Sequence, residues 1–303
     1  MQTSPGVSRR RYDLIAIDLD GTLLAPGGRV PDANIRAVRR AIDAGYAVSV
    51  CTGRSWAESR FALEAIGVDA PMVSAGGSMI VDPHSGETLH RYAMPDSVVR
   101  GVVERFTARG LASLVLKDPG VSPHDYLVVL GDGATLDPVS EWWFEALGVT
   151  YRMVESLDED EHPEWSVRVG ACAPSDSTLP IRDELMRAYE RSLLFHSFPA
   201  VAAPELVKDA GPRGEYHVVE AFDVDAHKWS GVAWVCDRLG LDPARTVAIG
   251  DEINDVTMIQ GAGLGIAMGN AVDEVARVAD RRTARNDEAG LAQAIDRVLA
   301  GVW

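Results

Sequence analysis

The segment Leu14-Ile15-Ala16-Ile17-Asp18-Leu19-Asp20-Gly21-Thr22 places two acidic residues directly after a short apolar run. A run of this length, bounded by charge, predicts a buried β-strand. Asp18 and Asp20 lie at positions i and i+2, so in an extended chain their side chains start on the same face. Two carboxylates held together need a positive partner, usually a divalent metal ion or a lysine. We therefore expect the rest of the sequence to supply that partner.

The composition favours a globular protein and excludes some classes of partner. The chain has 303 residues, of which 47% are hydrophobic, enough for one large domain or two ordinary ones. Its formal net charge is −16. Because nucleic-acid binding depends on basic surfaces, we expect no nucleic-acid partner and attribute the acidity to solubility.

The cysteines and the N-terminal segment bear on the compartment. Cys51, Cys172 and Cys236 are odd in number and form no CxxC pair, so we expect neither a disulfide framework nor a zinc site. The basic residues 9–11 precede an apolar run of only four residues, too short for a signal peptide. No stretch approaches the length of a membrane span. We expect a cytoplasmic protein with no membrane partner.

The order of expected elements predicts an α/β fold with an insertion. Apolar runs at 14–17, 47–51 and 71–75 alternate with helical patterns that end near Gly45 and Gly67, which is typical of βαβ units and a parallel sheet. After residue 81 the expected strands often follow one another directly, as in an α+β unit. The βαβ pattern returns at 218–222, followed by a helix from Lys228, strands at 246–249 and 265–268, and a helix at 291–299. We predict one parallel-sheet domain built from residues 1–82 and 213–303, with an α+β domain inserted at 83–212.

Chemically distinctive side chains follow three of the expected parallel strands. Asp18 and Asp20 follow the first, Thr52 follows the second, and Asp251 follows the strand 246–249. In open parallel sheets, ligands bind outside the carboxyl ends of the strands. The segment 251–255 (Asp-Glu-Ile-Asn-Asp) adds further oxygen ligands, and Lys228 adds a cation near a helix start. These residues predict an oxygen-lined site suited to Mg2+, where a phosphate bridges the metal, the Thr52 hydroxyl and the Lys228 ammonium.

These residues together resemble a known family. The segments Asp18–Thr22, Thr52-Gly53-Arg54, Lys228 and Gly250–Asp255 are similar to the four ordered motifs of the haloacid dehalogenase (HAD) superfamily. The chain has a large interval between Thr52 and Lys228. In this it resembles the Cof-like (IIB) branch of phosphatases, in which a C2-type cap domain is inserted at that place. Residues 265–271 and 286–290 are similar to the C-terminal segments of that branch. The resemblance implies a Rossmann-like parallel-sheet core with an inserted α+β cap.

The resemblance also implies roles for individual residues. Asp18 would be the nucleophile and Asp20 the general acid and base, and Asp18, Asp251 and the Asp20 main-chain carbonyl would hold Mg2+. Thr52, Gly53, Asn254 and Lys228 would bind the phosphoryl group; Lys228 would also belong to the catalytic residues, and Asn254 would help to orient the site. Asp255 would orient the site from the second shell of the metal, through Lys228, and Arg54 would reach the substrate or the cap.

The expected function is that of a Mg2+-dependent phosphatase acting on a small phosphorylated metabolite, such as a sugar phosphate, through an aspartyl-phosphate. Two alternatives stay open. One is a phosphotransferase similar to phosphohexose mutases, and the other is a non-catalytic phosphate-sensing protein similar to receiver domains. The chain also departs from the Cof-like pattern at one place: Gly76-Gly77 stand where that branch commonly has Asn-Gly. We expect the chemistry to be unaffected, but the substrate contacts or loop order near residue 76 to differ.

Overall fold

The structure is a computed structural model that describes residues 10–200 and 215–303. Its described residues form two compact units. Unit 1 comprises residues 10–52, 61–72 and 232–303, and unit 2 comprises residues 53–60, 73–200 and 215–231.

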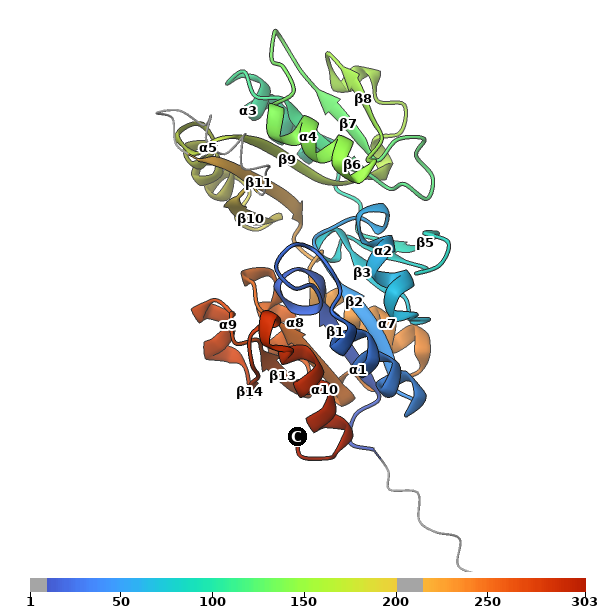
Figure 1. Ribbon diagram of the computed structural model, residues 1–303. Helices are drawn as coiled ribbons and strands as arrows, with labels where there is room; N and C mark the ends of the chain where they lie inside the picture. The colour runs from blue at the N-terminus through green and yellow to red at the C-terminus, as the bar shows by residue number, and fades with distance from the viewer. Residues whose placement is uncertain (1–9, 201–214) are drawn as a thin grey trace, which may run out of the picture. The chain divides into compact units, whose positions relative to one another are not determined.

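Among the described residues, eight strands form a sheet in the order β14-β13-β12-β1-β2-β3-β4-β5 (Figure 1). The strands are β1 (Leu14–Asp18), β2 (Ala47–Cys51), β3 (Met72–Ser74), β4 (Met79–Val81), β5 (Thr88–Arg91), β12 (Thr246–Gly250), β13 (Leu264–Ala267) and β14 (Arg281–Arg282). β1 lies between β2 and β12 and is parallel to both. All five residues of β1 are buried, as expected for a central strand covered on both faces. The predicted α/β class with a parallel sheet is therefore confirmed.

Helices complete unit 1 and pack on its sheet. They are α1 (Asp32–Asp43), α8 (Val256–Gly261), α9 (Asp273–Val278), α10 (Gly290–Leu299) and the larger parts of α2 (Trp56–Ile66) and α7 (Lys228–Leu239). α1 buries Ala37, Val38 and Ala41 on one face, a spacing typical of an amphipathic helix. The buried Asn34 side chain donates a 2.9 Å hydrogen bond to the Leu23 carbonyl. This bond fixes α1 against the turn that follows β1.

Unit 2 contains a second sheet of six described strands in the order β10-β11-β9-β6-β7-β8. The strands are β6 (Ser113–Lys117), β7 (Tyr126–Val129), β8 (Tyr151–Val154), β9 (Ser166–Pro174), β10 (Leu193–Pro199) and β11 (Tyr216–Asp223), and the helices are α3 (Asp96–Thr107), α4 (Pro138–Leu147) and α5 (Ser175–Ala188). The pairs are antiparallel except for β7 with β8. Apolar residues of α3 and α5 pack on one face of this sheet, where Phe106 and Leu185 are fully buried. This unit has the α+β character expected for the middle of the chain.

One expected element has a different place in the fold. Residues 218–222 were expected to resume the parallel sheet, and this expectation is wrong: β11 pairs antiparallel with β9 and β10 in the six-stranded sheet. The apolar pattern of a strand does not show which sheet the strand joins, and here the pairing partners precede it in the chain. Near the proposed domain boundary at 82/83, β5 pairs with β4 in the eight-stranded sheet.

The division into domains stays a proposal. The proposed boundary at 212/213 lies outside the described residues. The boundary proposed at 82/83 falls between β4 and β5, two paired strands of one sheet.

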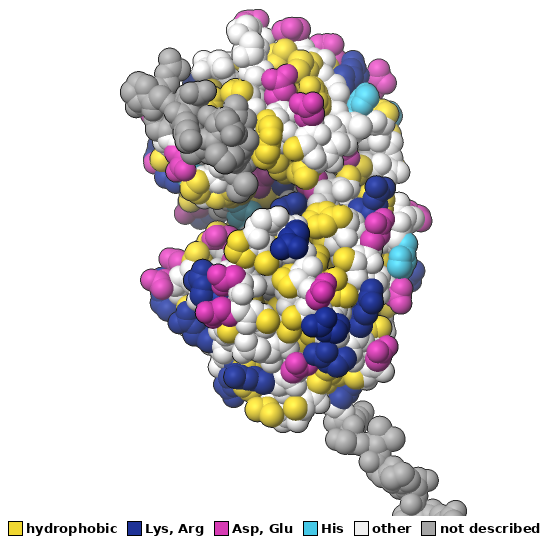
Figure 2. All heavy atoms as spheres, viewed as in Figure 1, with side chains coloured by type: hydrophobic (Ala, Val, Ile, Leu, Met, Phe, Trp, Pro, Cys, Tyr) yellow, Lys and Arg dark blue, Asp and Glu magenta, His cyan; other side chains and the backbone are white. Residues whose placement is uncertain are grey.

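The surface is consistent with the composition. On the face shown in Figure 2, acidic and basic side chains are interspersed, a pattern typical of a solvated surface. Across residues 10–200 and 215–303, none of the helices has the length and apolar character needed to cross a membrane.

Candidate active site

The turn after β1 carries the first pair of predicted residues. β1 ends at Asp18, and residues 19–23 form a tight turn closed by a 2.9 Å hydrogen bond from the Leu24 amide to the Leu19 carbonyl. Gly21 adopts a φ of +76°, and a Cβ at this position would lie 2.0 Å from Asp251 Oδ2. A side chain at residue 21 would therefore be strained and would also displace the Asp251 carboxylate.

Three acidic side chains converge at the carboxyl ends of β1 and β12. Asp18, Asp251 and Asp255 each offer one carboxylate oxygen, and these oxygens lie within 4.8 Å of one another. Asp18 and Asp255 are buried, whereas Asp251 is partly exposed. β1 and β12 are neighbouring parallel strands, so residues far apart in the sequence end at the same edge. The expected meeting of Asp18 with the 251–255 segment is therefore observed.

Two residues that the sequence argument did not assign hold Asp251. Thr22 Oγ1 donates a 2.7 Å hydrogen bond to Asp251 Oδ1, and Asn270 Nδ2 donates a 3.0 Å bond to Asp251 Oδ2. Asn270 Nδ2 also donates to the Gly21 carbonyl at 2.9 Å. Asn270 follows β13, the next parallel strand, so its place after a strand end was a signal that could have identified it.

Asp255 supports the loop that carries Asp251. Its side chain is buried, and Oδ2 accepts hydrogen bonds from the amides of Asp251 and Glu252 at 2.8 and 3.0 Å. These bonds fix the first turn after β12. The geometry matches an orienting residue, the role that the family resemblance implies for Asp255.

Three further predicted site residues, Asp20, Thr52 and Asn254, also belong to unit 1. Asp20 is exposed, whereas Thr52 is buried directly after β2. Asn254 Oδ1 is buried, and no described residue donates a hydrogen bond to it. Asp20 and Thr52 therefore differ in access to solvent: the carboxyl predicted to transfer protons is accessible, and the hydroxyl predicted to bind phosphate is shielded.

Unit 2 holds Gly53, Arg54 and Lys228 around the loop that follows β3. The Ala75 amide donates a 2.8 Å hydrogen bond to the Arg54 carbonyl. A Cβ on Gly77 would lie 2.2 Å from the carbonyl carbon of His227, so the loop packs directly against the residue before Lys228. Lys228 is fully buried at the start of α7. The meeting of these residues with Asp18 stays a prediction.

The same loop explains the departure at Gly76-Gly77. A Cβ on Gly76 would come within 3.0 Å of Phe222 Cε1 and 3.7 Å of His196 Cε1. The two rings pack on each other, with centroids 4.7 Å apart. Burial, together with the positive charges of Lys228 and Arg168, lowers the pKa of His196 to about 3. A neutral imidazole and a phenyl ring thus border the space that a larger residue 76 would need.

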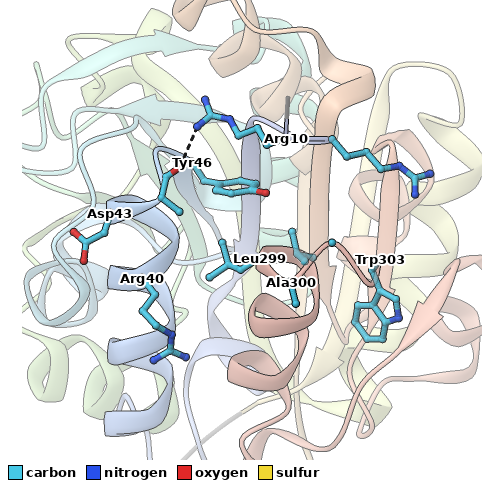
Figure 3. Close-up of a pocket in the computed structure, with 11 residues that line it drawn as sticks. Arg10, Arg40, Asp43, Tyr46, Leu299, Ala300 and Trp303 are labelled. Carbon is cyan, nitrogen blue, oxygen red and sulfur yellow. Dashed lines mark hydrogen bonds between the residues drawn. The ribbon is translucent and has the colours of Figure 1, made fainter. Parts of the chain in front are cut away.

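A separate pocket in unit 1 contains none of the predicted site residues. It encloses about 700 Å³ and is lined by Arg10, Arg40, Tyr46, Trp303 and neighbouring residues (Figure 3). Tyr46 immediately precedes β2, so the pocket lies near the amino end of that strand, whereas Thr52 follows its carboxyl end. Arg40 is paired with Asp296 at 2.5 Å, and Arg10 with Asp13 at 3.0 Å. These arginines therefore have structural partners within unit 1.

Comparison with known proteins identifies the family. A model of the haloacid dehalogenase-like hydrolase family matches residues 15–126 and 206–295. The chain is 27% identical to a 5-amino-6-(5-phospho-D-ribitylamino)uracil phosphatase of Bacillus subtilis, over 92% of this chain and 95% of the relative. It is also 27% identical to the pyridoxal phosphate phosphatase of Escherichia coli, over 86% and 89% of the two chains.

Solved structures share the fold. A haloacid dehalogenase-like hydrolase from Bacteroides thetaiotaomicron superposes with a TM-score of 0.73, at 24% identity, over 95% of this chain and 99% of that one. A HAD subclass IIB sugar phosphatase superposes with a TM-score of 0.74, at 20% identity, over 96% and 100% of the two chains. The chain belongs to the haloacid dehalogenase-like hydrolase family. The predicted superfamily, its Rossmann-like core with an α+β cap, and the prediction of an enzyme are confirmed.

Proposed function

We propose that this protein is a Mg2+-dependent phosphatase that hydrolyses a small phosphorylated metabolite through an aspartyl-phosphate on Asp18. The observation that carries the proposal is the convergence of Asp18, Asp251 and Asp255 at the end of β1. Relatives along nearly the whole chain are named as phosphatases of small phosphorylated compounds. These names support the class of substrate, and we propose a sugar phosphate or a similar compound.

The donor set fits a magnesium ion. Carboxylate oxygens within 4.8 Å of one another can share one hard cation, and the cluster is made of oxygen ligands alone. Asp18, Asp251 and the Asp20 carbonyl would hold the ion, while Asp255 keeps the 251–252 loop in place. The bound ion supplies positive charge that offsets repulsion between the Asp18 carboxylate and the substrate phosphate.

Asp18 and Asp20 carry the covalent chemistry in this proposal. An Asp18 oxygen attacks phosphorus, the bond from phosphorus to the leaving oxygen breaks, and Asp20 gives that oxygen a proton. Asp20 then takes a proton from water as the water attacks the phosphoryl group, which leaves as inorganic phosphate and regenerates Asp18. The exposure of Asp20 suits this role, because its proton must exchange with the leaving alcohol and with water.

The phosphoryl group needs donors as well as a nucleophile. We assign this task to Thr52, Gly53 and Lys228, with Asn254 orienting the group and Arg54 reaching toward the leaving group. Lys228 is suited to it because a fully buried ammonium retains a strong attraction for an anion.

A phosphate-release screen tests the proposal. Sugar phosphates, nucleotides and cofactor phosphates would be assayed with Mg2+ and with EDTA in its place. The proposal predicts release from at least one small monoester and loss of that release in EDTA. Release that persists in EDTA would contradict metal dependence. Formation of an isomerised sugar phosphate without free phosphate would favour a mutase instead.

A further inference from the structure

We propose that Arg168 is a positioning residue that holds the segment Thr52–Arg54 in its phosphate-binding conformation through the Gly53 carbonyl. The inference rests on the proposed function, because it assigns this segment to the phosphoryl group. Nothing in the sequence singled out Arg168, which is the third residue of β9.

The guanidinium of Arg168 has three oxygen partners in unit 2. Nη1 donates to the Gly53 carbonyl at 3.0 Å and is paired with Glu220 Oε1 at 2.9 Å. Nη2 donates to the Tyr126 hydroxyl. The guanidinium carbon also lies 5.9 Å from the ring centroids of both Tyr126 and Phe222. With 4% of its surface exposed, Arg168 has little freedom to leave this arrangement.

The position of Arg168 in its sheet argues against a role in the hydrophobic core. Val169 and Ala171 belong to the cluster under α3 and α5, so Arg168 points to the opposite face of β9. Burying a charged pair costs desolvation energy, and apolar residues of similar size often stabilise a fold equally well. Stability alone therefore gives little reason for an arginine here, whereas holding a main-chain carbonyl does.

A bond to the Gly53 carbonyl can fix the conformation of the segment Thr52–Arg54. The carbonyl of Gly53 and the amide of Arg54 belong to one planar peptide unit, so fixing the first fixes the direction of the second. The following groups are also fixed: Ala75 donates to the Arg54 carbonyl at 2.8 Å, and Glu58 Oε2 accepts from the Ser55 amide at 2.6 Å. Arg168 supplies the contact in this series that lies nearest to Thr52.

Charge around Arg168 makes the contact specific for a guanidinium. Glu58 and Glu220 are both held near it, and burial raises the pKa of each carboxyl while Arg168 opposes that shift. A guanidinium can bind a carboxylate, a carbonyl and a hydroxyl at once, because its donors form a fixed planar fork. A lysine at this position can hold fewer of these partners.

The test compares Arg168→Met and Arg168→Lys with a matched control. Lys117→Met is the control, because Lys117 is also buried in the six-stranded sheet, 2.5 Å from Asp160, and touches no proposed site residue. The probes are p-nitrophenyl phosphate, glucose 6-phosphate and pyridoxal phosphate, with inorganic phosphate as inhibitor. Thermal unfolding is measured for every variant.

A positioning role predicts a loss that does not depend on the leaving group. Arg168→Met should lower kcat/KM about 10- to 100-fold for every probe that the wild type hydrolyses, and should raise the inhibition constant of phosphate. Arg168→Lys should lie between Arg168→Met and the wild type. Lys117→Met should lower the unfolding temperature but leave the inhibition constant unchanged.

Three outcomes would overturn the inference: an unchanged inhibition constant in folded Arg168→Met, losses that differ strongly between leaving groups, or an equal rise in the constant for Lys117→Met. If Arg168→Met does not fold, the inhibition constant of phosphate is measured for Arg168→Lys instead, and an unchanged constant in that variant would overturn the inference. If the wild type hydrolyses none of the probes, the proposed function is in question. The role of Arg168 can then still be tested by calorimetric titration of the wild type and the Arg168 variants with inorganic phosphate. Variants that bind phosphate as tightly as the wild type would overturn that role.

Discussion

The Thr22 hydroxyl donates a 2.7 Å hydrogen bond to the Asp251 carboxylate across 229 positions of sequence. The bond ties the turn after β1 to the end of β12, the two places that supply the acidic cluster. It also occupies one lone pair of Oδ1 and fixes the direction of the carboxylate. The cluster is therefore oriented by partners that are not themselves acidic.

Replacing Thr22 with valine, which has nearly the same shape, tests this orientation. We expect the Mg2+ concentration for half-maximal activity to rise about 10- to 100-fold, as for other residues that orient metal ligands. Thr22→Ser keeps the hydroxyl and should stay near wild type. Equal magnesium requirements in both variants would contradict the role of the hydroxyl.

A substitution at Gly21 can separate the effect of a steric clash with Asp251 from the effect of backbone strain. Gly21→Ala should destabilise the fold by more than the roughly 1–2 kcal/mol cost of a left-handed backbone, because its Cβ would meet Asp251 Oδ2 at 2.0 Å. Gly28→Ala is the control, since Gly28 has a φ of +73° and open space around it. Chemical denaturation should show the larger loss for Gly21→Ala, and only that variant should lose activity. Similar losses of stability in the two variants would show that backbone strain alone accounts for the effect of Gly21→Ala.

Asp20→Asn tests the proton transfer. The variant cannot donate the proton to the leaving group, so we expect kcat/KM, which does not include breakdown of the phosphoenzyme, to fall about 100- to 10,000-fold with an alkyl phosphate. The fall should be smaller with p-nitrophenyl phosphate, whose leaving group needs no proton. Steady-state rates with both substrates give the comparison. A uniform loss would assign Asp20 to metal binding or folding rather than to acid catalysis.

His196 predicts a pH dependence of stability. Its pKa is about 3 in the folded protein, against 6.5 in the unfolded chain, so between these values the unfolded state binds a proton that the folded state does not. Stability should therefore fall as pH falls through this window, by up to about 2 kcal/mol between pH 6.5 and pH 5.

His196→Gln is the comparison for this prediction, because it lacks the titrating group and keeps a polar side chain of similar size. Urea unfolding at the two pH values should show a smaller decrease for the variant. An identical decrease in both proteins would show that other groups cause it.

The sequence predicted what depends on local pattern. The run Leu14–Ile17 is a central strand with both faces buried, and its period and length are visible in the sequence. β2 has the expected bounds, 47–51. The convergence of Asp18 with Asp251 follows from parallel strands that end at one edge, so it needed only the element order.

What could not be predicted depends on pairing between distant segments. Residues 218–222 form a strand, but an apolar run does not identify its neighbours, and β11 joins the other sheet. Arg168 contacts residues more than 15 positions away, and nothing in its local sequence distinguishes it from other strand residues. Asn270 also makes distant contacts, and only its place after a strand end marks it in the sequence. Gly76 was recognised as a departure, yet only the positions of Phe222 and His196 explain it.

In the proposed mechanism, Asp18 carries the phosphoryl group during turnover. The most direct measurement is mass spectrometry of peptides from enzyme that is quenched in acid during hydrolysis, with Asp20→Asn used to slow breakdown of the intermediate. We expect a phosphoryl group on the peptide containing Asp18, and its absence in a folded, inactive Asp18→Asn variant. Turnover by Asp18→Asn at a substantial rate, or a phosphoryl group on another residue, would contradict it.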